Sequence, residues 1–168
     1  MMNNSEVSQI LADCFEELDN ISALLVGLGD GANPTPYVKK YAVIKATGAI
    51  EIGFKQIIAD KVDHECNVQV KNFVTKKVRE SSFNPKLGLI ESMLSEFDQR
   101  WNNKFDELLS LEDKPALKGS LTELVNARNE FAHGGSPDVD IEKTIYYFQN
   151  GCKVLEILDQ VVNYDFDE

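Results

Sequence analysis

Apolar residues recur every three or four positions along most of the chain, which is the spacing of one face of an α-helix. The pattern is clearest near the N-terminus, where one stripe comprises Val7, Ile10, Cys14, Leu18, Ile21, Leu25 and Leu28. No segment alternates between apolar and polar residues for long enough to indicate a β-strand. The sequence therefore predicts an all-α protein.

Turn-forming residues divide the pattern into five to six helices. Glycine and proline interrupt it at 29–36, 81–85 and 134–137. The expected helices cover 7–28, 36–62, 65–79, 87–101 with a short continuation to 109, 115–134 and 141–162. The second is apolar on most sides, which favours a central position, and the third contains valines that also suit a strand. With no linker or repeat, residues 1–168 are expected to form a single domain, an up-and-down helical bundle.

Composition indicates where such a protein works. No apolar run approaches the roughly 20 residues that span a bilayer, and the N-terminus lacks the pattern of a signal peptide. Three widely spaced cysteines, an odd number, fit reduced thiols better than a disulfide framework. We therefore expect a cytoplasmic protein that does not contact membranes.

The charge of the chain opposes nucleic-acid binding. Its 17 Lys and Arg residues face 28 Asp and Glu residues, a net charge of -11, and an acidic protein repels nucleic acid at long range. RNA binding would need a local basic patch or a basic partner. The candidate RNA-binding patch is Lys71, Lys76, Lys77 and Arg79, with a looser cluster at Lys39, Lys40 and Lys45. Both sets also fit a solvated helix face.

One stretch, residues 126–135 (NARNEFAHGG), carries an arginine and a histidine five positions apart at the expected end of a helix. Histidine transfers protons near neutral pH, and arginine binds a phosphate and stabilises the charge that builds on it. Arg128 continues an apolar stripe, so its charge must be paired or must face a cleft. Asn129 and His133 share a neighbouring polar face. Arg128 and His133 lie about 140° apart on an ideal helix and do not point the same way, but both can border one groove if the helix frays into Gly134.

Attack by a ribose 2′-hydroxyl on the adjacent phosphate needs a base, an acid and positive charge. The chain has two histidines, His64 and His133, so acid–base work within one chain would need both at the same place. A two-fold dimer would instead supply a second His133 and a second Arg128.

The string Leu-Val-Asn-Ala-Arg-Asn-Glu-Phe-Ala-His-Gly resembles HEPN domains, and within them the ribonuclease-type, RiboL-PSP-HEPN-like branch. The resemblance covers residues 86–159 well, and the first half only in its helix pattern. It implies a homodimeric endoribonuclease that cuts RNA without a metal or other cofactor at a groove shared by two protomers. It also implies a setting in prokaryotic defence or toxin–antitoxin control, with an antitoxin or regulatory protein as a possible partner. The alternative is a non-catalytic interaction or nucleotide-binding module.

Supporting residues are also expected. Asn129 would orient His133 or contact the phosphate. Glu51 stands on the second helix, where HEPN relatives often carry a polar residue, but its spacing with Thr47 and Lys55 favours a surface ion pair. If Glu51 faces inward instead, it could pair with Arg128 or orient His133. The His64-Glu65-Cys66 string lacks a second ligand pair, so no zinc site is expected.

Overall fold

A computed structural model describes residues 2–29, 31–137 and 139–166. These residues form seven α-helices and one π-helical segment, with no strand among them. In chain order the elements are α1 (Ser5–Leu28), α2 (Thr35–Val62), α3 (Val68–Val74), the π-helical η1 (Thr75–Arg79), α4 (Leu87–Phe97), α5 (Gln99–Leu109), α6 (Lys114–Ala132) and α7 (Ile141–Val162). The all-α prediction is confirmed.

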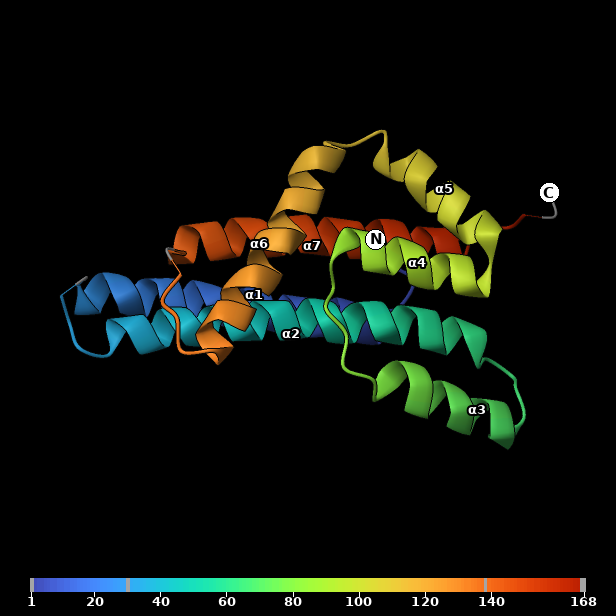
Figure 1. The fold of residues 1–168 in the computed structure, drawn as a ribbon, viewed down its shortest axis with the longest axis horizontal. Coiled ribbons are helices and arrows are strands. Elements are labelled where there is room, and N and C mark those ends of the chain that lie inside the picture. Colours follow the sequence, from blue (N-terminus) through green and yellow to red (C-terminus); the bar gives the residue numbers. More distant parts are fainter. Residues whose placement is uncertain (1, 30, 138, 167–168) are drawn as a thin grey trace.

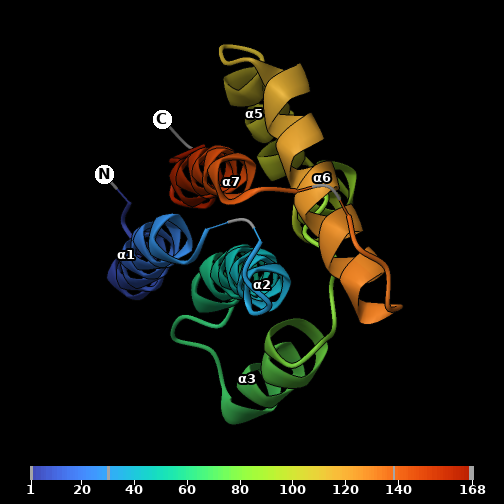
Figure 2. The same ribbon diagram turned by 90° about the vertical axis from the view of Figure 1, so that its left-hand side faces the viewer.

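Three long helices, α1, α2 and α7, lie side by side along the longest axis of the molecule (Figure 1). Viewed from the end, they form a triangle, with α6 crossing beside α2 and α7 and α3 lying on the outer side of α2 (Figure 2). One apolar core draws buried residues from α1, α2, α4, α5, α6 and α7. Because α6 crosses the long helices obliquely, only part of the expected up-and-down arrangement is present.

The central position of α2 is confirmed by buried residues on nearly every side of it. Glycines allow its neighbours to approach closely. A Cβ atom on Gly53 would lie 2.7 Å from Leu155 of α7 and 3.1 Å from Val7 of α1. A Cβ atom on Gly151 of α7 would lie 2.7 Å from Ile50 of α2 and 3.3 Å from Leu121 of α6. Three helices therefore meet where Gly151 has no side chain.

The expectation of five to six helices is wrong, because the fourth expected helix is two helices. Asp98 adopts an extended conformation (φ -155°, ψ 119°) and its carboxylate accepts a hydrogen bond of 2.8 Å from the backbone N–H of Arg100. It therefore caps a new helix, α5, instead of continuing α4. The ambiguous third region is helical from Val68 to Arg79, although η1 widens to the π-helical pattern. None of the described helices is long and apolar enough to cross a membrane.

Candidate functional site

The C-terminal end of α6 is closed by a defined backbone turn. His133 is the C-cap, and Gly134 follows with a positive φ of 83°. The N–H of Gly135 donates to the carbonyl of Glu130 at 2.9 Å, and the N–H of Gly134 donates to the carbonyl of Phe131 at 3.1 Å. These two bonds make a Schellman motif. The helix therefore ends at a fixed point and does not fray, so the condition under which Arg128 and His133 of one chain would border one groove on an ideal helix is not met.

Arg128 is held from three sides. Its Nη1 donates to Oε2 of Glu51 at 3.2 Å, and its Nη2 donates to the side-chain oxygens of Asn84 and, at 3.4 Å, of Asn129. The guanidinium is about one quarter exposed, with a side-chain exposure of 25%. The charge on the apolar stripe is thus paired, as expected. A guanidinium has five N–H donors, so these three bonds leave two for a ligand.

Glu51 faces inward, and the interpretation as a surface pair is wrong. Its side chain is 14% exposed, and that of Lys55 is 10% exposed. Oε1 of Glu51 accepts from Nζ of Lys55 at 3.1 Å and from the backbone N–H of Phe83 at 3.0 Å. Thr47 is fully buried and donates to the Val43 carbonyl at 2.7 Å. The face of α2 that carries Thr47, Glu51 and Lys55 is covered because α6 and the segment 80–86 pack over it. One carboxylate shared by Arg128 and Lys55 leaves this cluster with one net positive charge.

The segment that joins η1 to α4, here called the 80–86 linker, fixes the position of Arg128. Nζ of Lys55 donates to the Ser81 carbonyl at 2.7 Å, and the N–H of Phe83 donates to Glu51, so α2 binds the linker twice. Asn84 then accepts from Arg128. The sequence predicted a break in the helices here but gave no signal that Asn84 would meet Arg128, because the contact joins residues 44 positions apart.

His133 is exposed, and none of the hydrogen bonds among the described residues uses its imidazole. Asn129 is half-buried, and its side-chain oxygen accepts from Arg128. The structure therefore joins Asn129 to the arginine of the motif and not to the histidine. Glu130 is exposed on the same last turn.

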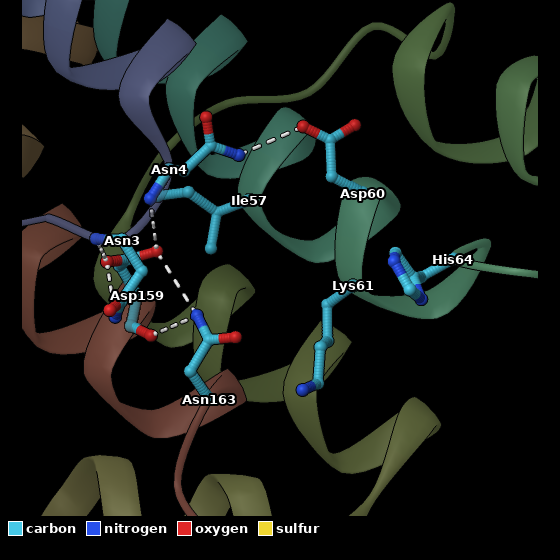
Figure 3. Close-up of a pocket in the computed structure, with 8 residues that line it drawn as sticks. All are labelled: Asn3, Asn4, Ile57, Asp60, Lys61, His64, Asp159 and Asn163. Atoms are coloured by element: carbon cyan, nitrogen blue, oxygen red, sulfur yellow. Dashed lines mark hydrogen bonds between the residues drawn. The ribbon is translucent and has the colours of Figure 1, made fainter.

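The second histidine lies at the opposite end of α2. Nζ of Lys40, near the start of α2, donates to the Phe131 carbonyl at 3.3 Å, whereas His64 follows the end of α2 at Val62. A helix rises 1.5 Å per residue, so Lys40 and Val62 are roughly 33 Å apart. His64 lines a cavity of about 300 Å³ with Asn3, Asn4, Ile57, Asp60, Lys61, Asp159 and Asn163 (Figure 3). Neither Arg128 nor His133 is among them, so one chain does not bring its two histidines together.

The candidate basic patch is divided. Arg79 forms ion pairs of 2.6 Å with both Asp63 and Asp60 at the end of α2, and these carboxylates, Asp63 first, raise the pKa of Arg79 above its ordinary value. Lys71, Lys76 and Lys77 are exposed. Asp60 lies nine residues beyond Glu51 on α2, or roughly 13 Å along the helix. Arg79 thus anchors η1 to α2, and two carboxylates neutralise its charge.

Comparison with known proteins identifies the family. The model of the RiboL-PSP-HEPN family matches residues 9–164, which include every helix from α2 to α7 in full. No curated protein and no solved structure gives a significant match. No three His, Cys, Asp or Glu side chains within the described residues gather closely enough to hold a metal ion. Because the match extends over nearly the whole sequence and includes the Arg128–His133 motif, the chain belongs to the RiboL-PSP-HEPN family.

Proposed function

We propose that this protein is a metal-independent endoribonuclease that acts as a homodimer. The observation that carries the proposal is the position of the Arg128 guanidinium. Glu51 and Asn84 hold it, and two of its N–H donors remain for a ligand. The exposed His133 follows five residues later, at the fixed end of α6. The 2′-hydroxyl of the RNA is the nucleophile. Arg128 binds the scissile phosphate and stabilises the charge that develops on it.

His133 is the general acid or base. Transfer of a proton from the 2′-hydroxyl and of another to the leaving 5′-oxygen requires two groups, and the other histidine of the chain stands at the far end of α2. The second imidazole therefore comes from His133 of a second copy across a two-fold axis. This is why we propose a composite site and not a site within one chain.

The remaining residues are positioning residues. Glu51 and Asn84 orient the guanidinium before RNA arrives, so less conformational freedom is lost on binding. Asn129 supports the same guanidinium. Lys55 offsets the charge of Glu51 and thereby keeps the site positive.

Family membership suggests the biological setting. We propose a role in prokaryotic defence or toxin–antitoxin control in the cytoplasm, with an antitoxin or regulatory protein as a second partner. Such a partner would also meet the need for a cell to restrain a ribonuclease that requires no cofactor.

Cleavage of single-stranded RNA in EDTA tests the proposal. The wild type and His64→Ala should cut RNA and leave fragments with a cyclic phosphate end, whereas His133→Ala and Arg128→Ala should not. His64→Ala is the matched control, because it removes the other exposed histidine of the chain. Single-stranded DNA should stay intact, since it lacks the 2′-hydroxyl. Cleavage that survives His133→Ala or that needs magnesium would contradict the mechanism.

The net charge of -11 favours a second candidate, a non-catalytic interaction or nucleotide-binding module. That function requires no proton transfer. It would leave the wild type without activity in the same assay, at every protein concentration at which the dimer forms.

A further inference from the structure

Several cations among the described residues of this acidic chain form ion pairs with carboxylates. Lys45 pairs with Glu17 at 2.6 Å, Lys55 with Glu51, and Arg79 with two aspartates. Lys40 and Lys86 differ, because each donates to a neutral oxygen. A phosphate can replace a neutral acceptor while the full charge of the ammonium remains available to it.

These two lysines lie on either side of the motif. Nζ of Lys86, from the 80–86 linker, donates to Oδ1 of Asn126 at 2.9 Å. Nζ of Lys40, from α2, donates to the Phe131 carbonyl at 3.3 Å. Their attachment points on α6 are five residues apart, or about 7.5 Å of helix, and Arg128 lies between them. Lys86 lies two residues after Asn84, which accepts from Arg128, and Phe131 lies three residues after Arg128, so both ammonium groups are anchored within one turn of Arg128 along the helix axis. Asn126 is about 160° from Arg128 around an ideal helix, so a strand that reaches all three cations must pass around this end of α6.

Glu130 places a negative charge at this end of α6, so RNA binding here needs nearby positive charges such as those of Lys40 and Lys86. It is exposed between the attachment points of Lys40 and Lys86 and repels a phosphate backbone. The exposed lysines of α3 and η1, Lys71, Lys76 and Lys77, belong to the part of the chain that Arg79 ties to the other end of α2.

We propose that Lys40 and Lys86 bind the phosphates on either side of the one that is cut. The substrate strand then runs along the end of α6, from the 80–86 linker to the start of α2, with its scissile phosphate on Arg128. Lys71, Lys76 and Lys77 do not contact this strand. This inference rests on the proposed function for the identity of the central phosphate.

Salt-dependent binding of a fluorescent 2′-O-methyl oligoribonucleotide, which cannot be cleaved, tests the inference. Each phosphate contact with a single strand contributes about 0.7 to the slope of log affinity against log salt, so Lys40→Gln with Lys86→Gln should reduce the slope by about 1.4. Between 50 and 200 mM salt, the wild type should then lose roughly sevenfold more affinity than this double variant. The matched control, Lys76→Gln with Lys77→Gln, should keep the wild-type slope.

Two further measurements separate charge from folding. Glutamine keeps a hydrogen-bond donor for the Phe131 carbonyl, and thermal unfolding of the double variant should match the wild type. Lys40→Arg with Lys86→Arg keeps both charges and should restore the slope.

An unchanged slope in the Lys40 and Lys86 variant, or a reduced slope in the Lys76 and Lys77 variant, would overturn the inference. So would a wild type that does not bind the oligonucleotide. Because the probe is never cut, a wild type that binds through Lys40 and Lys86 but does not cleave RNA contradicts the proposed catalysis alone.

Discussion

At the scale of residues, the arrangement around Arg128 depends on one carboxylate between two cations. The side chains of Glu51 and Lys55 are 14% and 10% exposed, so water screens their charges poorly. Removing Arg128 or Lys55 leaves Glu51 paired with the remaining cation. Removing Glu51 leaves two cations close together without a counter-charge, which is the more costly change.

Glu51→Gln should therefore lower the free energy of unfolding by about 3 kcal/mol, the cost of breaking a largely buried ion pair. Arg128→Ala leaves the Glu51–Lys55 pair in place and should cost about 1 kcal/mol. Urea denaturation of both variants measures the difference. Equal losses would mean that Glu51 stabilises the fold through Arg128 alone.

The three thiols should differ in reactivity. Burial raises the pKa of Cys14 and of Cys152 to about 12 from an ordinary value of 9.0. The thiolate is the nucleophile, so iodoacetamide at pH 8 should modify the half-buried Cys66 first, as mass spectrometry of the native protein can measure. The unfolded thiols ionise near pH 9 and the folded ones do not, so these two groups reduce stability as pH rises from about 9 to 12. Equally fast labelling of Cys14 would contradict its burial.

The sequence predicted the residue types of the site better than their contacts. The place of Arg128 on an apolar stripe predicted that its charge would be paired or would face a cleft, and the charge is paired with Glu51. Its partners could not be predicted, because Glu51 and Asn84 lie 77 and 44 positions away in the chain. Helical spacing alone gave Glu51 a partner at Lys55, and that pair is real, but spacing cannot reveal that α6 and the 80–86 linker bury it.

At the scale of elements, the end of α6 is determined by local backbone chemistry. Gly134 takes a left-handed conformation that a side chain disfavours, and this ends the helix at Ala132 with His133 as its C-cap. The sequence could indicate this end, since a glycine pair after a helical stripe is a strong local signal. It could not indicate that α6 crosses the long helices, because periodicity defines which face of a helix is buried but not the angle at which it packs.

Gly134→Ala should reduce stability by about 1 kcal/mol, the cost of placing a Cβ atom in the left-handed region. It should also reduce cleavage, because His133 loses its fixed position. Gly119→Ala is the control: it lies inside α6 with no atom near the new Cβ, and it should raise stability by about 0.5–1 kcal/mol. Thermal unfolding compares the two, and a Gly134→Ala variant as stable as the wild type would show that the turn is not under this constraint.

At the scale of the whole molecule, the proposed mechanism requires two copies of the chain, because each copy supplies one histidine, His133, to the site. Light scattering at micromolar concentration should report a dimer. When His133→Ala chains are added in large excess, most wild-type chains should pair with a variant, and the activity of each wild-type chain should fall. A stable monomer that cleaves RNA, or activity that is indifferent to the added variant, would contradict the composite site.

The close approach of three helices at Gly151 has a consequence for the cell that makes this protein. Ribosomes synthesise α7 after α6, and until α7 emerges, Ile50 and Leu121 lack the surface that covers both. The contact between α2 and α6, which includes the ion pair of Arg128 with Glu51, then lacks the packing that α7 provides. We therefore expect a nascent chain stalled before Gly151 to leave its own message intact, which isolated stalled complexes can measure. Under the proposed function, cleavage of RNA would begin only after α7 has been synthesised and has packed against α2 and α6.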